Sequence, residues 1–347
     1  MAAAIDLRSD TVTKPTPEMR AAMFAAEVGD DVYGEDPSIN SLEEHVADAL
    51  GTDAAIFVPS GTMANQIAVR LHCRPGDELL SDATSHVYLW EGGAPAALSG
   101  VTTRLIDGKF GVLTVRDLEG KLHAPDDIHS PNSRLVCLEN THNRGGGRVY
   151  PVETVREVSA WARRHGLAMH LDGARLWNAV VASGVPAREW CGHFDTVSVC
   201  FSKGLGAPVG SALAGPRELI HRARRVRKLY GGAMRQAGFL AAACRYALDH
   251  HVERLAEDHA NAKLLAAAVA DTPGLTLAPP QVETNLVWFE VAPEIGTARQ
   301  VAGRLREHGV LVAALGETVV RACTHLDVSR ADCERAAEVI RRHAAAG

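Results

Sequence analysis

The sequence has no excess of basic residues and no apolar run long enough to cross a bilayer. Its formal net charge is −6 and its isoelectric point is near 6.2. Nucleic acids and anionic membranes bind basic faces, so this charge balance argues against both as partners. No uninterrupted apolar stretch approaches ~20 residues, the length that a transmembrane helix needs, so we expect no membrane span.

Paired cysteines and recognisable metal motifs are also missing. The seven cysteines are an odd number and form no C-x-x-C pair, which fits a reducing compartment. Residues 1–10 contain no basic segment followed by an apolar one, so we expect no secretory signal and a cytoplasmic protein. The sixteen histidines form no H-E-x-x-H motif and no Cys/His cluster with ligand spacing, so no metal is expected.

The chain of 347 residues is long enough for about two domains. Between residues 50 and 215, short apolar runs alternate with helical patterns, which predicts a mainly parallel sheet covered by helices on both faces. The ligands of such sheets bind at the carboxyl ends of the strands. The predicted strands cover 54–59, 78–81, 135–138, 167–171 and 196–201, and the predicted helices cover 62–73 and 151–166.

After Pro216 the pattern is first helical and then mixed. Two long helices are predicted, and the breaks Pro273-Gly274 and Pro279-Pro280 separate them from a second, smaller α/β domain. The predicted helices cover 218–229, 235–270, 298–308 and 330–343, and the predicted strands cover 286–291, 310–313 and 319–322. We therefore expect an N-terminal arm and large domain over residues 1–245 and a small domain over residues 246–347.

Lys203 directly follows the predicted strand 196–201 and comes about 30 residues after Asp172. One βαβ unit would put that separation between the ends of two neighbouring parallel strands. An aldehyde cofactor such as pyridoxal phosphate needs a lysine to form an imine and a carboxylate that keeps its pyridine nitrogen protonated. A lone lysine after a strand is usually a solvated surface residue, so the surrounding residues must decide between the two interpretations.

Three neighbouring segments fit such a cofactor, and each has a simpler alternative. Ser60-Gly61-Thr62 joins a predicted strand to a helix, where free N–H groups favour a phosphate, although a plain helix cap is the alternative. His86 is either a satisfied turn histidine or a ring that stacks on the cofactor or relays a proton. Arg175 could reach the phenolic oxygen of the cofactor or the carboxylate of a substrate.

Motifs along almost the whole chain, from about residue 5 to 343, resemble those of a known family. They are DLRSDTVT at 6–13, VGDDVYGEDP at 28–37, LENTHN at 138–143, HLDGAR at 170–175, FSKGLGAPVGS at 201–211, GGAMRQAG at 231–238 and RACTHLDVS at 321–329. In this order they resemble the low-specificity L-threonine aldolases. The resemblance implies an α/β protein of the pyridoxal-phosphate-dependent, aspartate-aminotransferase-like fold (fold type I). That fold has a large domain with a mainly parallel mixed sheet and a smaller C-terminal α/β domain.

The resemblance also implies roles for individual residues. Lys203 would hold the cofactor as a Schiff base, Asp172 would bind its pyridinium nitrogen and His86 would stack on its ring. His129 matches a second catalytic histidine near the substrate hydroxyl. The implied cofactor-binding set is completed by Ser60, Gly61, Thr62, Arg175, Lys228 and Arg235, and the implied substrate-binding residues are Ser9, Arg175, Arg321, Tyr33 and Glu91.

The implied reaction is the cleavage of threonine or allo-threonine to glycine and acetaldehyde. Other reactions of the same fold, β-elimination or racemisation, remain open, as does a non-catalytic protein that only binds the cofactor. Family members build their sites at subunit interfaces, so a homodimer or a homotetramer is expected. The basic segment 222–228 is either a solvated helix face or a group of cations directed at a phosphate.

Overall fold

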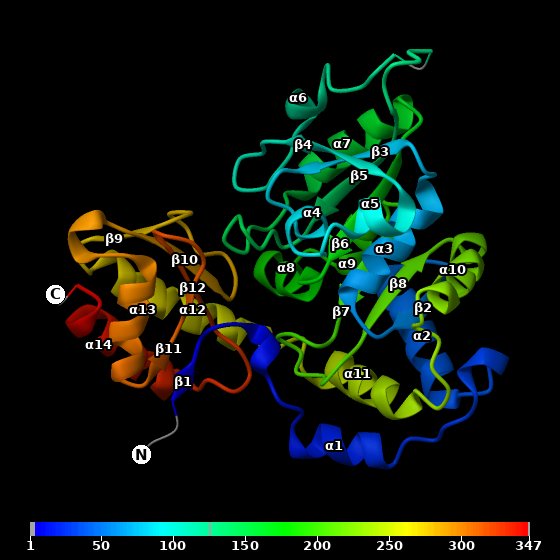
Figure 1. Cartoon of the computed structure of the whole chain (residues 1–347). Coiled ribbons are helices and arrows are strands. Elements are labelled where there is room, and N and C mark those ends of the chain that lie inside the picture. The colour runs from blue at the N-terminus through cyan, green and yellow to red at the C-terminus, as the bar shows by residue number, and fades with distance from the viewer. Residues whose placement is uncertain (1–3, 125, 346–347) are drawn as a thin grey trace.

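A computed structural model describes residues 4–124 and 126–345, and it contains a central seven-stranded sheet (Figure 1). The spatial order is β2-β8-β7-β6-β5-β3-β4. Strand β8 is antiparallel to both of its neighbours and the other neighbouring pairs are parallel, which confirms the mainly parallel mixed sheet. The strands are β2 (Ala54–Val58), β3 (Asp77–Asp82), β4 (Thr102–Ile106), β5 (Asn132–Glu139), β6 (Ala168–Gly173), β7 (Thr196–Cys200) and β8 (Ser211–Gly215).

Helices cover both faces of this sheet, as its apolar strands require. Alternate residues of β2 show the two faces, because Ile56 belongs to a hydrophobic cluster with residues of α3 and α10 while Phe57 belongs to another that includes residues of α2 and α11. The helices of this part are α1 (Pro17–Phe24), α2 (Pro37–Leu50), α3 (Gly61–His72), α4 (His86–Leu89), α5 (Ala94–Ser99), α6 (Val115–Leu118), α7 (Val152–Arg164), α8 (Leu176–Ser183), α9 (Ala187–Cys191), α10 (Arg217–Leu229) and α11 (Gly238–His250). Short 3-10 turns lie at η1 (Asp10–Val12) and η2 (Asp31–Tyr33).

The C-terminal part has its own antiparallel sheet of four strands in the order β12-β13-β10-β9 and a separate hydrophobic cluster around Phe289 (Figure 1). The N-terminal strand β1 (Ile5–Asp6) joins this part by pairing with β11 (Val310–Leu311). The other elements are α12 (Leu255–Ala270), β9 (Leu275–Leu277), β10 (Leu286–Val291), η3 (Pro293–Ile295), α13 (Ala298–Glu307), β12 (Ala313–Ala314), β13 (Val319–Cys323) and α14 (Arg330–His343). The predicted division at residues 245 and 246 falls inside α11 and stays a prediction.

Two predicted elements differ from the structure. The helix expected over 235–270 is two helices, α11 and α12, and at the end of α11 the buried His251 has its Nδ1 2.7 Å from the Leu205 carbonyl oxygen. The strand expected over 310–313 is divided between β11 and β12, which belong to different sheets. In the described residues, no helix combines the length and the apolar character needed to span a membrane.

Candidate active site

Asp172 and Lys203 lie beside each other at the carboxyl ends of neighbouring parallel strands. Asp172 is the second-last residue of strand β6 and pairs with Ser198 of β7. Lys203 lies three residues after Cys200, where β7 ends. The expected βαβ arrangement is therefore confirmed. Asp172 is buried and Lys203 is half-buried, with the Lys203 Nζ 3.8 Å from the Cys200 Sγ. The charge of Lys203 also helps to lower the pKa of the Asp172 carboxyl group.

The carboxylate of Asp172 is held in place but keeps room for another donor. The backbone N–H of Ala174 donates to its Oδ1 at 3.1 Å, and the Asn65 Nδ2 donates to its Oδ2 at 2.8 Å. Burial alone would raise the pKa of Asp172, but the charges of His86 and Lys203 and the Asn65 hydrogen bond outweigh burial and lower it. Two carboxylate oxygens have about four acceptor positions, so this buried anion can still accept a hydrogen bond from a protonated ring nitrogen.

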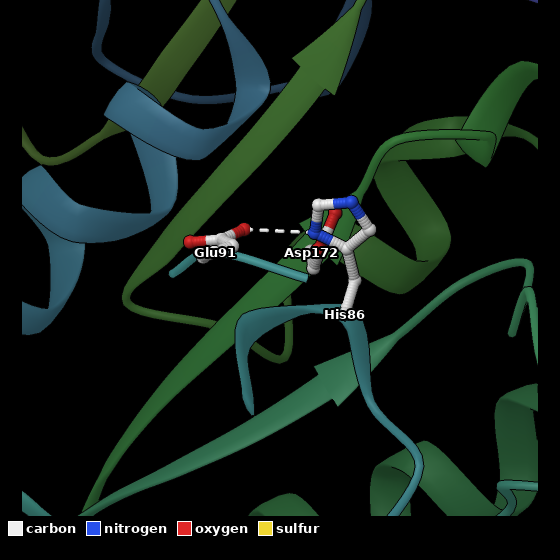
Figure 2. Close-up of side chains that lie close together, drawn as sticks. All are labelled: His86, Glu91 and Asp172. Atoms are coloured by element: carbon white, nitrogen blue, oxygen red, sulfur yellow. Dashed lines mark hydrogen bonds and ion pairs between the residues drawn. The ribbon is translucent and has the colours of Figure 1, made fainter. Parts of the chain in front are cut away.

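His86 is held by two carboxylates, one at its backbone N–H and one at its ring, and Figure 2 shows the ring contact with Glu91. It begins helix α4, its backbone N–H donates to the Glu139 Oε2 at 2.7 Å, and its Nδ1 lies 2.9 Å from the Glu91 Oε1. Burial would lower the pKa of His86, but the Glu91 hydrogen bond and the charges of Asp172 and Glu139 raise it. A proton on Nδ1 shared with Glu91 leaves Nε2 as the free nitrogen of the ring.

Glu91 lies behind His86. Its side chain is buried, and its second oxygen, Oε2, accepts a hydrogen bond from the Gln66 Nε2 at 2.5 Å. One oxygen each of Glu91 and Asp172 and one nitrogen of His86 all lie within 4.8 Å of one another, which is close enough for a metal ion. Donors already face these oxygens, since the Asn65 Nδ2 donates to both Glu91 and Asp172 at 2.8 Å. We therefore assign no metal to this cluster.

The N-terminus of helix α3 keeps two donors free for an anion. Ser60 caps the helix, because its Oγ accepts from the Met63 N–H at 3.2 Å and its carbonyl accepts from the Ala64 N–H at 3.2 Å. The N–H groups of Gly61 and Thr62 come before these and are the first of the helix. The helix-cap interpretation is thus confirmed, and a phosphate on the remaining donors stays a prediction that is compatible with it.

Arg175 has a partner that the sequence did not suggest. Its Nε and Nη2 donate to the two oxygens of Asp10, each at 2.7 Å, and both side chains are buried. The Asn285 Nδ2 donates to the same carboxylate at 3.1 Å. Asp10 therefore takes the Nε/Nη2 edge of the guanidinium, while both N–H groups of Nη1 and the second N–H of Nη2 remain for a cofactor or a substrate, so the role of Arg175 stays a prediction.

Arg321 is a half-buried cation with incomplete hydrogen bonding. Its Nη1 donates to the Asn143 Oδ1 at 3.1 Å, its Nη2 donates to the Arg8 carbonyl at 2.9 Å, and its buried Nε has no hydrogen-bond partner. Among the residues that the structure describes, Arg321 forms no ion pair with a carboxylate, and burial lowers its pKa. Ser9 follows Arg8 directly and caps the turn η1, so it lies on the same arm. An amino-acid carboxylate would complete this site.

His129 does not lie with the other predicted catalytic residues. It is in an exposed turn just before β5 begins at Asn132, whereas Glu139 at the far end of that strand is the one that pairs with Asp172. Seven residues of extended strand span about 23 Å, so His129 is at the opposite edge of the sheet. The structure does not bring His129 beside Asp172 of its own chain, and its catalytic role stays a prediction.

Tyr33, Lys228 and Arg235 are all exposed. Tyr33 lies in the turn η2, and the Asp31 N–H of that turn donates to the Arg235 carbonyl at 3.3 Å. Arg235 also forms an exposed ion pair with Asp30 at 3.3 Å, and Lys228 is in the last turn of α10. The structure does not bring these three side chains into the cluster around Asp172, and their roles stay predictions.

Four polar residues that build the site were not predicted from the sequence to have a role in it. Asn65 and Glu139 hold Asp172 and His86, while Asp10 and Asn143 hold the two arginines. Asp10, Glu139 and Asn143 fall inside the motifs quoted above, and Asn65 is in the predicted helix that follows Ser60-Gly61-Thr62. These positions were the only available signal, because hydrogen-bond partners far apart in sequence leave no local pattern. Their side chains shape the site through other residues.

Comparison with known proteins agrees with this geometry. Residues 6–292 match the family model of the beta-eliminating lyases. The low specificity L-threonine aldolase of Escherichia coli (strain K12) is 44% identical over 336 residues, covering 96% of this chain and 97% of that protein. The probable low-specificity L-threonine aldolase 2 of Arabidopsis thaliana is 42% identical over 335 residues, covering 95% and 94%.

The solved structure of the Leishmania major threonine aldolase superposes with a TM-score of 0.84 at 24% sequence identity, covering 97% of this chain and 99% of that one. This likeness shows the fold, and it confirms the expected fold type I architecture. The near full-length identities and the family model together show that the chain belongs to the low-specificity L-threonine aldolases, within the beta-eliminating lyase family.

Proposed function

We propose that the protein is a pyridoxal-phosphate-dependent lyase that cleaves L-threonine, L-allo-threonine or both to glycine and acetaldehyde. The reverse reaction and other β-hydroxy-α-amino acids belong to the same proposal. The observation that carries it is the placement of Asp172 and Lys203 at adjacent strand ends in a chain 44% identical to a low specificity L-threonine aldolase over nearly its whole length. Arg321, with an unpartnered Nε, supports an amino acid as the substrate.

The residues present fit pyridoxal phosphate. When bound, the cofactor supplies an electron sink that stabilises negative charge on the substrate Cα. The Nζ of Lys203 is the group that would hold it covalently, and the Asp172 carboxylate would accept the hydrogen bond of its ring nitrogen. The free N–H groups at the start of α3, with the Ser60 and Thr62 hydroxyls, would hold its phosphate. The His86 ring would lie against its ring.

The substrate carboxylate would be held by Arg321, with Ser9 and the remaining N–H groups of Arg175 beside it. Holding the carboxylate fixes which bond at Cα is aligned for cleavage. The Nε2 of His86 is the nitrogen that would take the proton of the β-hydroxyl group, because Nδ1 is already bonded to Glu91. The elevated pKa of His86 makes proton uptake favourable near neutral pH.

A product assay tests the proposal. Each of the four threonine stereoisomers is incubated with the protein, with and without added pyridoxal phosphate, and glycine and acetaldehyde are measured. We expect equimolar glycine and acetaldehyde from at least one L-isomer. Ammonia with a 2-keto acid would instead indicate the β-eliminating reaction that the family model names, inversion at Cα alone would indicate a racemase, and no turnover would indicate a protein that only binds the cofactor.

We further propose a cytoplasmic homodimer or homotetramer. All seven cysteines are free and buried, which fits a reducing compartment. Tyr33, Lys228 and Arg235 are exposed, and in another subunit's site Lys228 or Arg235 could contact the phosphate. Mixing inactive Lys203→Ala subunits with inactive Arg235→Ala subunits should then restore part of the activity. No recovery in exchanged heterodimers contradicts a role of Arg235 across the interface, and a fully active monomer contradicts the assembly.

A further inference from the structure

Asn65 is a buried amide at the centre of the candidate site, in the first half of helix α3 and with 1% of its surface exposed. Its Nδ2 donates to the Asp172 Oδ2 and to the Glu91 Oε1, each at 2.8 Å. Its Oδ1 accepts from the Ser198 Oγ at 2.8 Å and lies 3.1 Å from the His170 Nε2. An amide has two N–H donors and two acceptor positions, so every hydrogen-bonding position of Asn65 is used.

The surroundings leave only one orientation for this amide. Nδ2 must face the two carboxylates, because ionised carboxylates can only accept hydrogen bonds. Burial lowers the pKa of His170 to about 4, so its ring is neutral near pH 7 and carries one proton. With that proton on Nε2, His170 donates to the Asn65 Oδ1, and Nδ1 can accept from the Thr196 hydroxyl at 2.9 Å. The Thr196 carbonyl oxygen lies 3.1 Å from the same Nδ1. The Oδ1 of Asn65 is thus held by neutral groups and its Nδ2 by the two carboxylates.

The two carboxylates would disturb each other without this amide. Asp172 and Glu91 are both buried, and their ligand oxygens lie within 4.8 Å of each other and of a His86 nitrogen. Like charges at such distances raise each other's pKa unless donors and cations compensate them. The titratable groups around Asp172 are His86, Lys203, His170 and Glu91. Among the described residues, Asn65 is the one side chain that donates to both carboxylates.

We propose that Asn65 is a positioning residue that aims the Asp172 carboxylate at the ring nitrogen of the cofactor and couples it to the Glu91–His86 pair. It acts through Asp172 and Glu91 and does not itself touch the reacting atoms. The inference rests on the proposed cofactor site and is independent of which amino acid is cleaved.

The test uses the holoenzyme with pyridoxal phosphate and no substrate, so a wrong choice of substrate cannot affect it. Asn65→Ala removes both donors, and Asn65→Asp keeps the shape and Oδ1 but puts an oxygen where Nδ2 faced two carboxylates. In both variants the acid limb of the pH titration of the cofactor absorbance should move up by about one to two pH units. The dissociation constant for pyridoxal phosphate should rise about 10- to 100-fold.

Two neighbouring variants separate positioning from a loss of packing. Gln66→Leu removes the donor to the other Glu91 oxygen but does not touch Asp172, and Ser198→Ala removes a donor to the Asn65 Oδ1 while leaving both Asn65 donors in place. Both should leave the acid limb closer to that of the parent than either Asn65 variant does. Thermal unfolding of each holoenzyme verifies folding, and if one Asn65 variant does not fold the other is used.

Three results would overturn the proposal. The first is that Asn65→Ala or Asn65→Asp folds and shows the same acid limb of the cofactor titration and the same cofactor affinity as the parent. The two control variants could shift the acid limb as far as the Asn65 variants do. Neither Asn65 variant could fold while Ser198→Ala alone reproduces the full shift. If cofactor binding follows the prediction but no threonine isomer is cleaved, the proposed reaction fails and the role of Asn65 stands.

Discussion

Replacing Arg321 should remove substrate binding with little effect on the cofactor. The guanidinium is held by the Asn143 Oδ1 at 3.1 Å and the Arg8 carbonyl at 2.9 Å, and both contacts are to neutral groups. Its Nε has no hydrogen-bond partner, and it forms no ion pair with a carboxylate of the described residues. An incoming carboxylate would therefore gain a charge-assisted contact with an arginine that is already oriented.

The expected loss follows from these contacts. A hydrogen bond to a charged group contributes about 1.5–3 kcal/mol, and a two-point contact does not add fully, so we expect about 2–4 kcal/mol in total. This corresponds to a decrease of about 30- to 1,000-fold in kcat/KM for Arg321→Gln, which keeps most of the side-chain volume. Arg321→Lys should also be impaired, because an ammonium group cannot reproduce the planar fork.

The assay is kcat/KM for L-threonine cleavage, followed by acetaldehyde release, with the cofactor absorbance of each variant as a check on the site. Arg144→Ala is a matched control, because Arg144 also lies over the Trp288 ring, at 5.0 Å compared with 5.8 Å for Arg321. Its removal takes away a neighbouring cation without breaking the contacts of Arg321, so it should cost less than about 5-fold. An Arg321→Gln enzyme with kcat/KM within about 3-fold of the parent would refute the assignment.

Three further outcomes are expected. Borohydride reduction of the holoenzyme should fix the cofactor on the peptide that contains Lys203, and a label on another lysine in the peptide map would contradict the central assignment. Asp10→Asn leaves the buried Arg175 without its anion and should lower the free energy of unfolding by about 3–5 kcal/mol in urea titrations at pH 7. Although burial raises the pKa of Asp10, Arg175 and Lys203 depress it below its unfolded value, so this stabilisation is present above about pH 4 and is lost as the pH falls through the folded pKa. Unfolding curves of the parent and the Asp10→Asn variant should therefore converge in acid, and a constant difference down to the acid transition would rule out this linkage. Glu91→Gln removes a contact that raises the pKa of His86, so the midpoint of the His86 titration by NMR should move to lower pH, and an unchanged midpoint would show that Glu91 is not its partner. In the parent the protonated form of His86 stabilises the fold below about pH 6.5, and this contribution is lost as the pH rises through the raised pKa.

The sequence by itself determined the central sheet and the position of its functional edge. Continuous apolar runs between helical patterns can only be buried on both faces, and this puts the ends of neighbouring parallel strands side by side. Asp172 and Lys203 were therefore predictable as neighbours, and β6 and β7 confirm it. The cap at Ser60 was predictable for a different reason: its hydrogen bond with the Met63 N–H spans only three residues, so it depends on local sequence.

Tertiary structure alone decided which polar groups meet across the sequence. Arg175 pairs with Asp10, 165 positions away, a partner that nothing in the sequence suggested. Asn65 contacts Asp172 across 107 positions. His129 was expected near the site but lies apart from it: it comes three residues before β5, whose far end carries the residue that pairs with Asp172. Local patterns record burial and turns, whereas the partner of a buried charge depends on which strands and loops pack together, and no short segment contains that information.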